Sequence, residues 1–327
     1  MNKAKLGIAL LALLLLVIFS FCLYWSRIPA MFDVKSEADN RAKQLAIPIV
    51  TGSYTSSTLI QITETLLNKP GGFISNDILP PGLLIDNITS WEYGVLIQVR
   101  DMSRAMRDTF SRSQSQSKED DDLSRAESRF NISHTAWAFP SAESQYQEGV
   151  DALYRYLKRL SDSKSSTSQF YARADNLRSW LSIAEVRLGD LSQRLGASVG
   201  QHRINTDLAG DAAATQSTTK SAETLVKTPW LELDDVFYEA RGSAWALIHL
   251  LRAVEIDFAD VLKKKNAQAS LAQIIRELEA SQQPLMSPMI LNGSGFGLWA
   301  NHSLVMASYL SRANAAMIDL RNLLEKG

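Results

Sequence analysis

The chain is poor in cysteine, proline and glycine, and its charges nearly cancel. Its one cysteine, Cys22, lies in an apolar N-terminal stretch, so the rest of the chain has no disulfide and no thiolate nucleophile. Only 9 prolines and 16 glycines occur in 327 residues, which favours long elements over many short strands. The formal net charge of −1 gives no basic field for nucleic acid, so we expect no nucleic-acid partner.

Common catalytic and metal-binding motifs are missing as well. The sequence has no Gly-x-Ser-x-Gly elbow and no His-Glu-x-x-His pair. Its histidines do not fall in pairs at metal-ligand spacing on one helix; they are His134, His202, His249 and His302. We therefore predict no catalytic residue, no metal and no cofactor, and the sequence leans away from an enzyme without deciding the point.

The N-terminal run from Leu6 to Trp25 is apolar along its whole length. It matches the roughly 20 residues that a helix needs to cross a bilayer. A cleaved signal peptide would have a shorter apolar core with small residues at its end. A lipoprotein signal would have a small residue before the cysteine, but Phe21 precedes Cys22, and a core helix would show a polar face. We predict a transmembrane helix over residues 6–25, in contact with membrane lipid.

Charges on the two sides of this span do not decide its orientation. Lys3 and Lys5 precede the span, and several basic residues follow it: Arg27, Lys35, Arg41 and Lys43. A head as short as residues 1–5 usually stays in the cytoplasm. We therefore expect residues 1–5 to be cytoplasmic and the bulk of the chain, residues 36–327, to lie outside the cytoplasm.

Helical periodicity dominates the remainder. Apolar residues recur at alternating steps of three and four from Phe170 to Leu195, from Phe237 to Val261 and from Trp299 to Leu324. A shorter series runs from Tyr146 to Leu160. This pattern predicts an all-α fold, in which one transmembrane helix precedes a large multi-helix bundle. The alternative is a homo-oligomeric coiled coil, although alanines in the seams favour packing of several helices.

Three stretches break the helical pattern. Residues 68–82 form a loop rich in proline and glycine, and residues 111–122 are polar and then acidic. Residues 206–227 have no apolar period and are rich in alanine, threonine and serine, which predicts a mobile linker. No alternation of apolar and polar residues lasts long enough to predict a sheet.

Five stretches of the sequence together resemble a known family. They are NKPGGFISND (68–77), QVRDMSRAMRDTFSRSQSQS (98–117), QFYARADNLRSWL (169–181), DDVFYEARGSAWALIHLLRAVEIDFADVL (234–262) and SPMILNGSGFGLWANHSLVMASYLSRANAAMIDLR (287–321). The family is a bacterial one of single-span inner-membrane proteins, catalogued as a domain of unknown function. The resemblance implies a bacterial inner-membrane protein. With the orientation expected from the short N-terminal head, the bulk of the chain would lie in the periplasm. The resemblance implies no activity and no site residue.

One face of the helix after Asp234 is a weak candidate for a ligand site. It carries the side chains of Arg241, Trp245, His249 and Arg252. Guanidinium groups beside an indole could bind an anionic or sugar-like ligand through paired hydrogen bonds and stacking. The alternative is a second packing face, whose arginines pair with Glu239 and Glu255.

A glycine-rich loop before the last helix is the second weak candidate. Gly293, Gly295 and Gly297 could let backbone N–H groups approach an anion at a helix N-terminus. The loop lacks the lysine and the preceding strand of the known phosphate-binding motifs. The alternative is a tight turn in which Phe296 is packed.

Two functions remain open on this sequence. The first is a non-catalytic cell-envelope protein that acts as a scaffold or adaptor for an envelope protein partner. The second is a ligand-binding or hydrolytic domain that acts on an anionic or glycan molecule of the envelope.

Overall fold

Helices account for most of the described chain. The computed structural model describes residues 3–113, 118–162, 168–204, 223–287 and 289–326. The α-helices are α1 (Lys3–Trp25), α2 (Val34–Leu45), α3 (Ser53–Asn68), α4 (Asp86–Ala105), α5 (Asp121–Phe130), α6 (Ala142–Leu160), α7 (Ala174–Gly196), α8 (Leu233–Asp257), α9 (Ala259–Lys264), α10 (Gln268–Ala280) and α11 (His302–Lys326). Single helical turns are η1 (Gly82–Leu84), η2 (Met106–Phe110), η3 (Ala197–Val199) and η4 (Trp230–Glu232). The predicted all-α class is confirmed.

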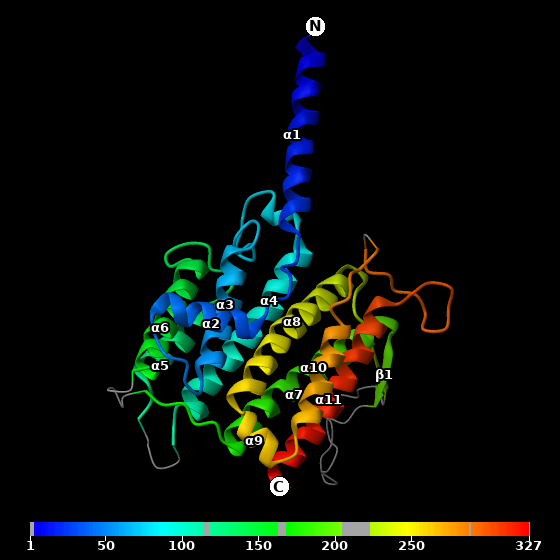
Figure 1. Cartoon of the computed structure of the whole chain (residues 1–327). Helices are drawn as coiled ribbons and strands as arrows, with labels where there is room; N and C mark the ends of the chain where they lie inside the picture. Colours follow the sequence, from blue (N-terminus) through cyan, green and yellow to red (C-terminus); the bar gives the residue numbers. More distant parts are fainter. Residues whose placement is uncertain (1–2, 114–117, 163–167, 205–222, 288, 327) are drawn as a thin grey trace, which may run out of the picture.

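Helix α1 projects from one end of the bundle as a lone apolar rod (Figure 1). None of its residues is buried. Its 23 residues span about 35 Å at 1.5 Å per residue, against about 30 Å for a hydrocarbon core. By length and composition it can cross a membrane, and a signal sequence would pass the same test.

Helix α8 is the centre of the bundle (Figure 1). It contacts α3, α4, α7, α10 and α11, and its residues are buried almost continuously from Leu233 to Val254. A helix that is buried on most sides needs apolar or small residues over most of its surface. Its buried polar side chains, such as Glu239 and His249, have hydrogen-bond partners inside the protein.

Helices α4 and α8 cross at two glycines. A Cβ atom at Gly94 would lie 2.0 Å from the carbonyl oxygen of Glu239, and one at Gly242 would lie 2.0 Å from that of Trp91. The backbones therefore meet with no side chain between them. The pair runs parallel, since Ser90 bonds Asp235 and Gln98 bonds Ser243 further along. Both helices consequently begin at the end of the bundle that carries α1.

The predicted helical seams are packed inside this one bundle. The apolar series of α7 lies against α11, and residues such as Leu188, Leu310 and Met317 are fully buried. The bundle interpretation therefore accounts for these seams, and they leave no free stripe for a coiled-coil partner. Some predicted bounds were wrong: α7 begins at Ala174, α11 begins at His302, and the series from Phe237 to Val261 breaks at Phe258 between α8 and α9.

The expectation of no sheet was wrong in one place. Strands β1 (Gln201–Ile204) and β2 (Glu223–Val226) pair antiparallel. The predicted linker at 206–227 thus ends in a strand, and residues 206–222 of it lie outside the described residues. The end of the polar and acidic stretch 111–122 is ordered by contacts within the domain, because Asp120 caps α5 and pairs with Arg159 at 2.7 Å.

We predict that Gly242→Ala lowers the free energy of unfolding by about 1–3 kcal/mol or more, because the methyl group would force α4 and α8 apart. Gly94→Ala should act alike. Chemical denaturation of the detergent-solubilised chain measures the effect. The control is Gly189→Ala in α7, where the added Cβ meets its nearest atom, Asn314 Nδ2, at 3.5 Å. This change should stabilise by about 0.5–1 kcal/mol. Equal effects at Gly189 and Gly242 would contradict the close crossing.

Candidate functional site

Two of the predicted ligand-binding residues, Trp245 and His249, lie in the interior of the protein. Both rings are buried, and the ring of Phe32 stacks on His249 with centroids 3.9 Å apart. The Phe32 ring also meets Trp245 edge-on at 5.9 Å, and Trp245 in turn packs on Trp91 at 5.3 Å. We call Trp91, Trp245 and His249 the anchor socket, because the segment that it receives follows α1 directly.

Hydrogen bonds fix the state of His249. Its Nε2 accepts a bond from the backbone N–H of Phe32 at 3.1 Å. Its Nδ1 lies 2.7 Å from the carbonyl oxygen of Trp245, so Nδ1 must carry the proton and donate it. Burial lowers the pKa of His249 to about 4. The ring is therefore neutral at pH 7, and both of its nitrogens are used inside the protein.

The anchor socket ties the membrane-spanning candidate to the bundle. Cys22, Trp25, Ile28 and Phe32 all pack against the core from the end of α1 and the segment after it. Helix α2 then begins at once, with the carboxylate of Asp33 accepting a bond from the N–H of Ser36. The passage from α1 to the bundle is therefore a packed connection and not a loose tether.

The two arginines of the predicted face point to different partners. Arg252 forms an ion pair with Glu279 at 2.5 Å, and Arg241 donates to the carbonyl oxygens of Gln282 and Gln283. The expected pairing with Glu239 and Glu255 was wrong for Arg241 and Arg252. The prediction of one open ligand face from these four positions needs correction too, because its aromatic half is buried beneath Phe32.

Arg241 nevertheless lines a cavity of about 310 Å³. Among the described residues it has no carboxylate partner, and its Nε is buried without a hydrogen bond. Burial lowers the pKa of Arg241, which reflects the cost of holding a charge there. The other walls are mostly apolar or aromatic: Phe237, Leu285, Met286, His302, Val305, Met306 and Tyr309. An unpaired cation in such a wall suits an anion that carries an apolar group.

In the glycine-rich loop, the backbone N–H groups of Gly293 and Gly297, which were expected to face an anion, form hydrogen bonds within the loop. The N–H of Gly293 donates to Ala300, and that of Gly297 donates to Ser294. At Gly295, a Cβ atom would meet the side chain of Leu304 at 3.4 Å. The alternative was wrong in its detail, because Phe296 is not packed but fully exposed.

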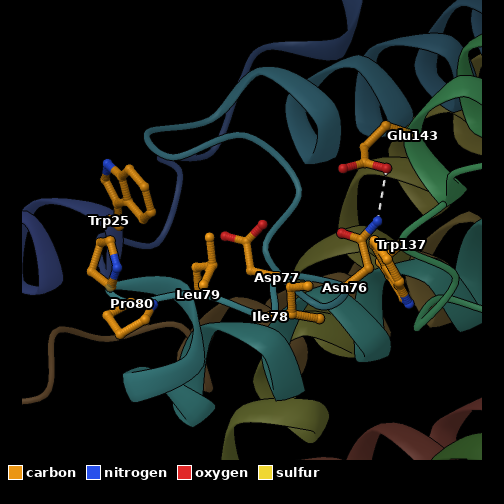
Figure 2. A pocket seen from close by; sticks show the side chains of 9 residues that line it. Trp25, Asn76, Asp77, Ile78, Leu79, Pro80, Trp137 and Glu143 are labelled. Carbon is orange, nitrogen blue, oxygen red and sulfur yellow. Dashed lines mark hydrogen bonds between the residues drawn. The ribbon is translucent and has the colours of Figure 1, made fainter.

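A second cavity, of about 320 Å³, lies at the base of α1 (Figure 2). Trp25 stands on one side of it and Trp137 on the other, with the loop from Asn76 to Pro81 between them. Asn76 bonds Glu143 at 2.8 Å. The pKa of Asp77 is raised by burial and then by the negative charge of Glu143.

A buried carboxylate shapes the loop beneath this cavity. Glu92 of α4 pairs with Lys69 at 2.5 Å, and both side chains are fully buried. The same carboxylate accepts bonds from the N–H groups of Ile74 and Ser75.

The sequence analysis identified residues 68–82 as a loop and did not identify the cavity that they line. The signal that it missed was composition, because Trp137 lies in a segment from 130 to 142 that has no Asp, Glu, Lys or Arg.

The neutral state of His249 makes stability depend on pH. The unfolded pKa, about 6.5, lies above the folded value of about 4, so the unfolded chain binds more protons between them. Stability from this group is complete above pH 6.5 and falls as the pH drops towards 4, by up to about 1.4 kcal/mol per pH unit. Denaturation at several pH values should show this slope for the wild type and lose it in His249→Gln. Parallel curves for the two proteins would contradict the assignment.

Comparison with known proteins adds a family and nothing beyond it. A family model described as "Uncharacterized protein conserved in bacteria (DUF2333)" matches residues 2–327. No curated protein and no solved structure matches the chain. Within the described residues, no group of three or more His, Cys, Asp or Glu side chains is placed to hold a metal ion.

Proposed function

The chain belongs to this uncharacterised bacterial family, and on that premise we propose that it is a single-span protein of the inner membrane that acts as a scaffold or adaptor in the cell envelope. Residues 1–5 are cytoplasmic, and the helical domain lies in the periplasm. Its partner is another protein of the envelope.

The observation that carries this proposal is the packed connection between α1 and the bundle. Phe32 is held by ring stacking on His249 and by a backbone hydrogen bond to the same ring. Such a connection restricts the height and tilt of the domain relative to α1. An enzyme that acts on a diffusing substrate has no need of this restriction, whereas an adaptor must present one surface at a set distance from the membrane.

The proposal is tested by loosening that connection. In the test variant, a flexible Gly/Ser spacer is inserted after Ser26; in the control, the same spacer follows Gly327 ahead of an affinity tag. We expect crosslinking in cells to recover the same protein partner with the wild type and the control. Recovery should fall with the internal spacer, because the domain no longer stands at a fixed height.

Two results would contradict the proposal. One is equal recovery from both spacer variants, and the other is no recurring partner under any condition. The same strains report orientation when the tag is exchanged for a reporter enzyme that is active only outside the cytoplasm. Activity of that reporter after Gly327 is expected, and its silence would reverse the orientation.

A second candidate function is binding of an amphiphilic anion in the cavity beside Arg241. The observation that favours it is the buried guanidinium, which lacks a carboxylate partner among the described residues and whose Nε is unbonded. A carboxylate or phosphate head would pair with this cation, and the apolar group would lie against Phe237 and Met306. Of the four side chains that the sequence proposed for an anion-binding face, only Arg241 lines this cavity.

Three probes with one tail length test this candidate: octanoate, octyl phosphate and octanol. Calorimetry of the chain in nanodiscs should show tighter binding of the two anions than of the alcohol. Arg241→Met should remove that preference, and Arg241→Lys should keep part of it. The matched control is Arg252→Met, which alters an ion-paired arginine outside the cavity lining. Equal affinity of the wild type for octanoate and octanol would rule the site out.

A further inference from the structure

Four connections lie at the end of the bundle that carries α1: residues 69–85, 131–141, 228–232 and the described residues of 281–301, which are 281–287 and 289–301 (Figure 1). The first two line the cavity at the base of α1. The third precedes α8, which begins beside the start of α4. The fourth is held there by bonds from Arg241 to Gln282 and Gln283.

These four connections expose large apolar side chains in unusual number. They are Ile78, Leu79, Leu83, Leu84, Trp137, Phe139, Trp230, Leu231, Met286, Met289, Phe296, Leu298 and Trp299. We call this set the apolar end. The rest of the described domain exposes fewer such side chains: Met31, Ile49, Val186, Val199, Leu225, Val305, Ile318 and Leu323. Of these, Val305 lines the same cavity as Met286. Soluble proteins seldom expose a large apolar patch unless something covers it.

Charge follows the opposite distribution. No Asp, Glu, Lys or Arg occurs between Glu279 and Arg312, or between Arg129 and Glu143. The far end is rich in such residues, as in the lysine run 263–265 at the end of α9 and the acidic run 119–122 at the start of α5. Two of the four connections towards α1 thus carry no charged residue. The other two carry Lys69, Asp77 and Glu232, of which Lys69 is buried against Glu92.

Tryptophan marks the same end. Trp91, Trp180 and Trp245 are core residues, whereas Trp137, Trp230 and Trp299 are 62%, 74% and 73% exposed. All three exposed rings belong to the apolar end, and Trp25, the last residue of α1, lines the same cavity as Trp137. Tryptophan is enriched at the boundary between lipid headgroups and acyl chains, because its indole N–H can contact water while the rest of the ring is apolar.

We propose that the apolar end rests in the interface of the same bilayer that α1 crosses. The bilayer is the occupant that the structure favours, because α1 leaves the domain at this end and holds it within reach of lipid at all times. The absence of charged residues from the longest connection suits lipid, since charge would have to be left in water. This inference rests on the proposed membrane anchoring and adds a second contact to it.

Spin labels on single cysteines can test the contact in the full chain. The one native cysteine is removed by Cys22→Ser, and the protein is placed in nanodiscs of phosphatidylethanolamine and phosphatidylglycerol. Labels go to Leu79→Cys and Phe296→Cys in the apolar end. Phe19→Cys on α1 reports the span. The water control is Val186→Cys, which is about as exposed as Leu79 but lies near the middle of α7 and not in a connection at either end.

Collision of each label with dissolved oxygen and with a water-soluble nickel chelate reports its surroundings. We expect positions 79 and 296 to favour oxygen over nickel, as position 19 does, and position 186 to favour nickel. If position 19 favours oxygen while positions 79 and 296 favour nickel, α1 lies in lipid but the apolar end does not, which overturns the docking and leaves the anchor. A preference for nickel at position 19 would overturn the membrane anchor itself. Labels at 79 and 296 that meet neither agent would mean that protein covers this end, which also overturns the proposal.

Discussion

The backbone contact between α4 and α8 is the constraint on which the rest of the structure depends. At Gly94 and Gly242 no side chain separates the two helices, so carbonyl oxygens of one lie directly against the other. Because the pair is parallel, the connections that precede both helices fall at one end of the bundle, where α1 also leaves. The remaining helices surround this pair, and the anchor socket is formed by Trp91 from one member and Trp245 and His249 from the other. A single crossing thus sets the position of the anchor.

The same arrangement divides the molecule into two ends of different chemistry. Towards α1, buried charge is used to hold loops, as with Glu92 and Lys69, while the loop surfaces carry apolar side chains. Away from α1, charged groups lie nearer the solvent and pair across helices, as Asp122 does with Arg155 and Arg159. A domain that meets water on one side and lipid on the other would be expected to show this division, and an isolated soluble bundle would not.

Much of the architecture could be predicted from periodicity, and little of the site could. The seams of α7 and α11 follow a period near 3.5 residues, so their helices and buried faces were readable. Periodicity shows which residues share a face but not what covers it. For Trp245 and His249 the cover is Phe32, which is remote in sequence, and no local pattern indicates it. The exposed state of Phe296 was missed for the opposite reason, because an aromatic residue in a glycine-rich turn was assumed to need a core.

The socket also has a consequence for the order in which the chain acquires its structure. Phe32 and His249 are separated by 217 positions, so the segment that follows the anchor has no place to settle until α8 has been synthesised. On the proposed anchoring, α1 can enter the membrane before then, while the chain behind it grows with the segment around Phe32 not yet in contact with α8. Contacts of such long range form late, after the local helices. The nascent protein is therefore a tethered chain of preformed helices for most of its synthesis, and the join between tether and domain closes near the end.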